Sequence, residues 1–183
     1  NGFDKEALKL LKKKKNLRLI DATNYSLKEI LRFISANEEV LIQTEDFNKF
    51  NIRDFKVVSK KKPNSKQMKN LIFAFNICRY VKSNAIVLAT NETTVGIGSG
   101  QPSRLDSCQI AIEKMKKFIK VKDEVVAASD AFFPFTDGIE KLVQSGVTAV
   151  IQPSGSIRDK EIINFANETD TVLVFSKTRH FRH

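Results

Sequence analysis

The sequence predicts an α/β fold in which helices cover both faces of a mixed β-sheet. Apolar runs typical of strands alternate with amphipathic segments typical of helices along most of the chain. The 183 residues are 42% hydrophobic, which suits one compact domain, or one with a small N-terminal appendage. No run approaches the ~18 apolar residues of a membrane helix, so we predict no membrane contact.

The N-terminal part predicts two helices and several short strands. Asp4 is placed to cap a helix that runs to about Lys15. Ser26 and Glu29 have the spacing of a capping box, which predicts a second helix over 27–35. Short strands are expected at 17–21 (LRLID), 40–43 and 55–59.

From Pro63 onward helices and strands alternate regularly. Pro63 lies near the start of a long helix at 65–81, whose centre is apolar nearly all round and should be buried. Strands at 85–89 and 93–97 are expected to form a hairpin that turns at Asn91. The later elements are predicted as helices at 103–119, 134–145 (closed by Gly146) and 156–167, and strands at 125–128, 148–151 and 171–175.

Charge is distributed unevenly along the sequence. The net charge is +10, and residues 1–66 hold 16 basic and 9 acidic residues. The basic clusters, Lys12–Lys15 and Ser59–Pro63, are solvated faces or contacts for an anionic partner. RNA binding would favour exposed aromatic residues among the basic ones. Most of the 14 phenylalanines lie in apolar patterns instead, so nucleic acid is not the partner we predict.

The cysteine and histidine content argues against disulfides and zinc. The only cysteines are Cys78 and Cys108, and the only histidines are His180 and His183. With neither a CxxC nor an HxE motif, we expect reduced thiols, a cytoplasmic protein and no bound metal. The chain starts at Asn1 without a methionine, so we interpret it as a fragment.

Three loops each follow a strand and lead into a helix. In an open α/β sheet such loops line the crevice where ligands bind, and helix starts attract anions. The glycines of the first loop indicate either a tight turn or bare backbone that allows close approach of a ligand. Arg104 there either holds an anionic group or pairs with Asp106 or Asp130. The loops are GIGSGQPSR (96–104), SDAFFPFTD (129–137) and QPSGSIRD (152–159).

The second loop permits two interpretations. Its phenylalanines surround Pro134, and Asp130 and Asp137 lie beside them. Such a group is either part of the core or a slot with an apolar wall and a polar end, suited to a flat heteroaromatic ring.

The third loop and the C-terminus also remain open. Ser156 and Asp159 are explained by helix capping alone, and Arg158 is expected to be exposed. The terminal TRHFRH is either a frayed tail or an anion clamp at the same crevice.

Six ordered blocks together resemble a known family. They are VSKKKP, VKSNAIVLA, GIGSGQPSR, SDAFFPF followed by Asp137, VIQPSGSIRD and the terminal RHFRH. They resemble the C-terminal half of the bifunctional purine enzymes that join AICAR formyltransferase to IMP cyclohydrolase. The likeness extends from about Phe55 to His183. Residues 1–50 are expected to end the preceding transformylase subdomain, and residues 51–183 to form the C-terminal one.

The resemblance implies a fold, a reaction and a partner. The fold is a three-layer α-β-α, cytidine-deaminase-like subdomain without zinc. The reaction transfers a formyl group from 10-formyltetrahydrofolate, a co-substrate, to the 5-amino group of the nucleotide AICAR in purine synthesis. The family's sites form across a homodimer, which implies one here.

The resemblance also implies roles for particular residues. Asn84 matches the active-site asparagine near the formyl group, and Arg179 matches the arginine that contacts the nucleotide phosphate. Phe132 would face the nucleotide base as well as the folate. The implied folate contacts are Arg104, Phe132, Phe133, Pro134, Phe135 and Asp137.

One departure limits what this chain would do alone. The family's Lys-His pair, whose histidine accepts a proton, belongs to the first transformylase subdomain, and the sequence contains no Lys-His dipeptide. The cyclohydrolase domain is missing as well. We therefore expect an inactive half-site. The alternatives are a non-catalytic module that binds nucleic acid or a phosphate ligand, and a zinc deaminase.

Overall fold

The chain divides into two units, which are described separately. The computed structural model describes residues 2–24, 31–46, 51–118 and 124–183. The first unit extends from Asn1 to Glu45 and the second from Asp46 to His183. The assignment of the first unit to a preceding subdomain stays a prediction.

The first unit contains one short helix and one hairpin. Helix α1 (Lys5–Leu11) begins after Asp4, whose Oδ1 accepts a hydrogen bond from Ala7 N at 2.8 Å. This confirms the predicted cap, although the helix ends before Lys15. Strands β1 (Leu31–Ala36) and β2 (Glu39–Thr44) pair antiparallel. Strand β2 confirms the strand predicted at 40–43.

Two predictions for this unit are wrong. Residues 31–35, expected in a helix, form β1, and residues 17–21 form no strand. The start of the expected helix, with its capping box, lies outside the described residues. Asn37 has a positive φ of 55° and turns the chain between β1 and β2. The apolar residues of 31–35 therefore pair across a hairpin, which overrides the local helix signal.

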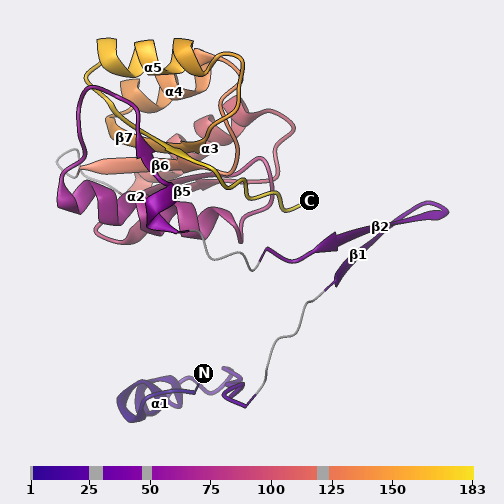
Figure 1. Cartoon of the computed structure of the whole chain (residues 1–183). Coiled ribbons are helices and arrows are strands. Elements are labelled where there is room, and N and C mark those ends of the chain that lie inside the picture. Colours follow the sequence, from indigo (N-terminus) through magenta and orange to yellow (C-terminus); the bar gives the residue numbers. More distant parts are fainter. Residues whose placement is uncertain (1, 25–30, 47–50, 119–123) are drawn as a thin grey trace. The chain divides into compact units, whose positions relative to one another are not determined.

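The second unit alternates helices and strands as predicted, and Figure 1 shows their order by colour. Its six strands form one sheet in the order β3-β8-β7-β6-β4-β5. The elements are a 3₁₀ turn (Ile52–Asp54), β3 (Lys56–Val57), α2 (Ser65–Cys78), β4 (Ile86–Thr90), β5 (Thr93–Gly98), α3 (Arg104–Phe118), β6 (Val125–Ser129), α4 (Thr136–Gln144), β7 (Val147–Pro153), α5 (Asp159–Glu168) and β8 (Val172–Ser176).

The sheet is mixed. Strands β6, β7 and β8 run parallel, whereas β4 pairs antiparallel with both β5 and β6, and β3 pairs antiparallel with β8. The predicted β4–β5 hairpin is confirmed, and its two turn residues, Asn91 and Glu92, have φ values of 49° and 51°. Two consecutive left-handed residues match the twist of paired strands.

Helices cover both faces of the sheet, which confirms the predicted three-layer class. One core packs α2 against alternate residues of the strands, among them Val87, Val126 and Val174. The other core packs α3, α4 and α5 against the opposite residues, such as Leu88, Ala127 and Leu173. Figure 1 shows α2 on one side of the sheet and α4 and α5 on the other.

Helix α2 is buried on the side that faces the sheet, as its apolar centre predicts. Leu71, Ala74, Phe75 and Cys78 are fully buried, at the spacing of one helix face. Asn64 caps the helix in a capping box with Gln67, so Pro63 lies just outside the first turn. Across the described residues, no helix is long and apolar enough to cross a bilayer.

Candidate functional site

The ends of five strands meet at one edge of the sheet. Ile86 at the start of β4 pairs with Ser129 at the end of β6 and with Gly98 at the end of β5. Pro153 at the end of β7 pairs with Ser176 at the end of β8. The three loops singled out from the sequence and the C-terminal tail therefore all leave the sheet at this edge.

A pocket of about 480 Å³ lies there, and it brings together every residue predicted for the site. The residues come from four stretches of sequence that are as far apart as Asn84 and Arg179. Their chemical roles stay predictions. The predicted residues that line the pocket are Asn84, Arg104, Phe132, Phe133, Pro134, Phe135, Asp137 and Arg179.

Arg104 forms a buried ion pair with Asp130. The Arg104 side chain is 9% exposed and that of Asp130 is fully buried. Arg104 Nη1 donates to Asp130 Oδ1 and, at 2.8 Å, to Ser129 Oγ. Of the alternatives open from the sequence, the structure shows pairing with Asp130 and not with Asp106. Three of the five guanidinium N–H groups are accounted for, since Nη2 donates to Asn84.

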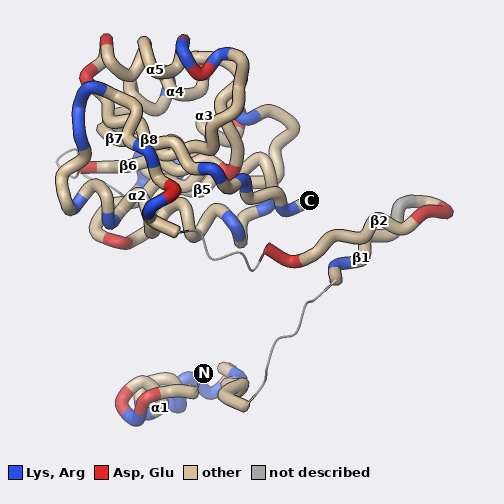
Figure 2. Tube along the Cα trace, viewed as in Figure 1, with Lys and Arg blue, Asp and Glu red and all other residues tan. Residues whose placement is uncertain are grey.

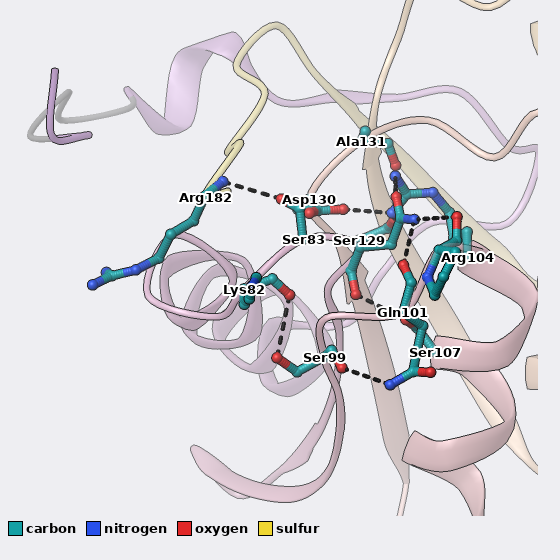
Figure 3. A network of polar contacts seen from close by, with 12 residues as sticks. Lys82, Ser83, Ser99, Gln101, Arg104, Ser107, Ser129, Asp130, Ala131 and Arg182 are labelled. Atoms are coloured by element: carbon teal, nitrogen blue, oxygen red, sulfur yellow. Dashed lines mark hydrogen bonds and ion pairs between the residues drawn. The ribbon is translucent and has the colours of Figure 1, made fainter. Parts of the chain in front are cut away.

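The side-chain amide of Asn84 is held on both sides, by Gln101 and by Arg104, which are both labelled in Figure 3. Asn84 Nδ2 donates to Gln101 O at 2.9 Å and to Pro102 O at 3.1 Å. Asn84 Oδ1 accepts from Arg104 Nη2 at 2.9 Å. Both amide hydrogens are thus engaged. For Asn84 Nδ2 to donate a hydrogen bond to a ligand, as expected, one of its bonds to the loop carbonyls would have to break. Oδ1, in contrast, can accept one further hydrogen bond.

Two glycines of the first loop serve packing and a third serves the tight turn; close approach of a ligand to this loop stays a prediction. A Cβ on Gly96 would lie 2.1 Å from Ala111 O, and one on Gly98 would lie 1.8 Å from Ser107 O. Their absence allows α3 to lie directly against β5. Gly100 has a φ of +68° and serves the turn. The loop therefore places Arg104 by close helix–strand contact.

The phenylalanines of the second loop divide between core and pocket. Phe133 is 1% exposed and belongs to the core, where it lies over Gly138, whose Cβ would be 2.7 Å from the Phe133 ring. Phe135 is 51% exposed. The core interpretation is confirmed for Phe133, which also borders the pocket, whereas the slot for a flat ring stays a prediction.

Two arginines from other loops stack on this aromatic wall. The guanidinium of Arg179 lies 5.0 Å from the ring centroid of Phe132, and that of Arg158 lies 4.7 Å from that of Phe135. Such cation–π contacts keep the cations beside the rings. The Phe135–Arg158 contact was not expected from the sequence, because the two residues lie 23 positions apart.

Asp137 lies in the first turn of α4, where its Oδ1 accepts a hydrogen bond from Gly138 N at 2.7 Å. The third loop is held by hydrogen bonds of its own. Asp159 accepts from Gly155 N and Ser156 N, while Ser156 Oγ accepts from Arg158 N. Helix α5 begins only at Asp159, with Arg158 as its N-cap and no side-chain capping hydrogen bond there, so the predicted capping box at Ser156 is wrong and these bonds hold the loop before the helix.

The C-terminal tail is held against the sheet edge, so the frayed interpretation is wrong. His180 N donates to Asp130 O at 2.9 Å, Ser83 N donates to Arg182 O at 2.9 Å, and Arg182 N donates to Ser83 Oγ. Figure 3 shows Arg182 beside Ser83. Arg179 and Phe181 line the pocket, as alternation along an extended segment requires. Phe181 was missed because no pattern identified the tail as a strand-like segment.

His180 points away from the pocket and is fully buried. Its Nδ1 contacts a carboxylate oxygen of Asp46, and its ring lies 4.6 Å from that of Phe75. Burial lowers the pKa of His180 below its usual 6.5, although the hydrogen bond and the charge of Asp46 act in the opposite direction. In the fold the ring is therefore biased toward its neutral form.

Neither cysteine is activated. Both are free and buried. Burial raises the pKa of the Cys108 thiol to about 12 and that of Cys78 well above its usual value. Thiolates are the nucleophilic form, so nucleophilic catalysis by these residues is disfavoured. Over the described ranges, no three His, Cys, Asp or Glu residues are grouped as a metal site would require.

The basic residues are spread over separate elements. Figure 2 shows Lys and Arg on α1, on the stretch before α2 and along the C-terminal tail. In the second cluster Lys61 pairs with Asp170 at 2.6 Å, and Lys62 Nζ donates to Ser59 O. This cluster is therefore partly neutralised within the fold.

Comparison with known proteins identifies a class of enzymes. Residues 1–114 match the model of the AICARFT/IMPCHase bienzyme family. Since this match covers more than half of the chain, the chain belongs to that family.

The curated relatives share one name, Bifunctional purine biosynthesis protein PurH. The protein from Persephonella marina is 43% identical over 99% of this chain, and that from Fusobacterium nucleatum is 45% identical over the whole of it. The protein from Limosilactobacillus reuteri is 43% identical, again over the whole chain. These alignments cover 35–36% of each relative, so the chain spans about a third of their length.

Proposed function

We propose that this chain supplies the folate- and nucleotide-binding half of a site that transfers a formyl group from 10-formyltetrahydrofolate to AICAR. One observation carries the proposal. The residues to which the family resemblance gives ligand-binding roles, although dispersed along the sequence, line one pocket at the strand ends. In open α/β sheets this edge is where ligands bind.

The pocket offers complementary contacts for two flat, charged ligands. The exposed parts of Phe132, Pro134 and Phe135 form an apolar wall for ring stacking, and the Asp137 carboxylate accepts hydrogen bonds from ring N–H groups. Arg179 supplies the cation for a phosphate, through charge-assisted bonds of about 1.5–3 kcal/mol each. The wall also excludes water and orients the two rings, which lowers the entropic barrier.

The reaction needs an attacking amine and a place for developing negative charge. The AICAR amine nitrogen attacks the formyl carbon, whose carbonyl electrons move to oxygen. The amine loses a proton, and collapse of the intermediate breaks the carbon–nitrogen bond to the folate, whose nitrogen takes up a proton. Asn84 Oδ1 has an acceptor position left to orient an amine hydrogen. The remaining N–H groups of Arg104 are donors near the oxyanion, where one donor contributes about 10²–10³ in rate.

The proton acceptor is supplied by the rest of the protein. Among the described residues of this chain, the pocket lining contains no histidine, and His180 is turned toward Asp46. We therefore propose a divided site, completed by another part of a longer polypeptide. The proposal includes the cytoplasmic homodimer that the family resemblance implies.

The proposed function is tested by calorimetric titration of the 183-residue chain with a folate analogue. We expect saturable binding that Asp137→Ala weakens about tenfold, because one charge-assisted hydrogen bond is lost. Asp106→Ala is the matched control. Asp106 also lies in the first turn of a helix, α3, but it is exposed and lies outside the pocket lining, so binding should be unchanged.

Two results would contradict the proposal. Equal binding of the folate analogue by wild type and Asp137→Ala would show that Asp137 does not contact the pterin ring. Salt-dependent RNA binding without folate affinity would favour a non-catalytic nucleic-acid module instead.

A further inference from the structure

Asp130 lies behind the pocket, and the family resemblance assigned no role to it. Its side chain is fully buried and does not line the pocket. One carboxylate oxygen, Oδ1, contacts Arg104 Nη1, and the other, Oδ2, has no hydrogen-bond partner within the described part of the chain. Among the described residues, the side-chain hydrogen bond of this carboxylate is therefore to Arg104, and its influence on the pocket passes through that residue.

Arg104 passes this constraint to the pocket. Its guanidinium is planar and rigid, so fixing Nη1 on Asp130 and Ser129 also fixes the direction of Nη2. Nη2 donates to Asn84 Oδ1 at 2.9 Å. An amide can be turned by 180° with little change in shape, but only the observed orientation presents oxygen to the guanidinium.

The loop carbonyls complete the restraint on Asn84. Gln101 O and Pro102 O accept both Nδ2 hydrogens. If the amide turned over, its nitrogen would face Arg104 and its oxygen would face two carbonyl oxygens, so every one of these contacts would become repulsive. Arg104, held in place by Asp130, thereby selects one orientation of the Asn84 side-chain amide.

We propose that Asp130 is a positioning residue that, through Arg104, fixes the side-chain amide of Asn84 with its oxygen available in the pocket. It does not touch the substrates. The inference rests on the proposed function only where it says what the fixed orientation of Asn84 is used for. The orientation itself is a property of the ligand-free chain.

The test reads the Asn84 side chain directly. In ¹⁵N-labelled chain without ligand, the Asn84 NH₂ resonances are assigned from Asn84→Asp, which lacks them. Asp130→Ala should shift both Asn84 proton signals and increase their exchange with water, because Arg104 loses its fixed partner. Asp130→Asn keeps an acceptor oxygen and should produce a smaller change of the same kind. Asp106→Asn removes a charge from the first turn of α3, the helix that begins at Arg104. This control variant should leave the Asn84 signals in place.

The same variants are then titrated with the folate analogue. We expect affinity to fall about tenfold in Asp130→Ala and less in Asp130→Asn, because the loss of the fixed Arg104 contact removes about one charge-assisted hydrogen bond to the ligand. If Asp130→Ala does not fold, by circular dichroism and thermal unfolding, the Asp130→Asn signals decide. Folded Asp130 variants with unchanged Asn84 resonances would overturn the inference. Altered resonances in a chain whose wild type binds no folate would support the positioning and refute the proposed function.

Discussion

At the level of single residues, the Arg104–Asp130 pair combines stability with organisation of the site. Both partners are almost fully removed from water. A buried pair gains little over well-packed apolar residues, but removing one partner leaves an uncompensated charge. This residue pair was among the alternatives that the sequence left open. The choice between Asp106 and Asp130 depends on contact across the sheet edge, which spacing along the chain does not reveal.

The stability of this pair can be measured by replacing the arginine. We expect Arg104→Met to lower the free energy of unfolding by about 3–5 kcal/mol, because Asp130 remains buried and charged. Arg158→Met is the control. Arg158 pairs with Glu161 at 3.1 Å on the surface, with 42% of its side chain exposed, so its loss should change stability by no more than about 1 kcal/mol. Similar values for both variants in urea unfolding would contradict this account.

His180 predicts how stability depends on pH. Its folded-state pKa is lowered by burial, so the unfolded chain binds a proton more readily than the folded chain. This stabilising contribution is complete above the unfolded value of about 6.5 and decreases as the pH falls toward the folded pKa. The charged groups acting on the ring are Asp46, Arg79 and Asp130.

The measurement is urea unfolding of wild type, His180→Gln and His183→Gln between pH 5 and 7.5. Wild type and His183→Gln, whose ring is exposed, should lose stability with acidification more steeply than His180→Gln. Parallel slopes for all three proteins would show that His180 does not titrate with folding.

At the level of elements, the sequence predicted the second unit well and the first unit poorly. Strongly apolar strands and capped helices of residues 51–183 have clear local signals, and the β4–β5 turn at Asn91 is typical of hairpins. The strand at 31–36 has none. Its apolar residues Leu31 and Phe33 are exposed on a two-stranded hairpin, and Leu31 and Ile34 also have the i, i+3 spacing of a helix, so this short run does not distinguish the two structures.

The role of the glycines also could not be derived from sequence. A run of glycines fits a ligand loop and a close helix–strand contact equally well, and only the Cβ positions distinguish them. For the same reason the sequence identified the wall phenylalanines but did not separate the core residue, Phe133, from the exposed one, Phe135.

Replacing Gly96 tests the contact between α3 and β5. A Cβ there would meet the backbone of Ala111, so we expect Gly96→Ala to lower stability by about 1–3 kcal/mol and to weaken binding of the folate analogue by displacing Arg104. Gly146→Ala is the comparison. Gly146 has a φ of +97° with open space around it, so strain alone should lower stability by about 1–2 kcal/mol without altering binding. A Gly96→Ala chain with wild-type affinity would show that α3 can shift without disturbing the site.

At the level of the whole molecule, the proposed function assigns to this chain one side of a reaction site. Ring stacking, a carboxylate and an arginine are grouped at one edge, whereas the proton acceptor implied by the family is missing from the sequence. We expect the purified chain to form no product with 10-formyltetrahydrofolate and AICAR, although it binds a folate analogue. Turnover above that of a boiled sample would show that a complete set of catalytic groups is present within the 183 residues.

The alternating tail has one more consequence. Arg179 and Phe181 face the pocket, while the residue between them is enclosed beside Phe75 and Asp46. A proton taken up by the enclosed imidazole would loosen a three-residue stretch whose other two side chains line the pocket. Mild acid should therefore reduce ligand capture while the sheet is still intact.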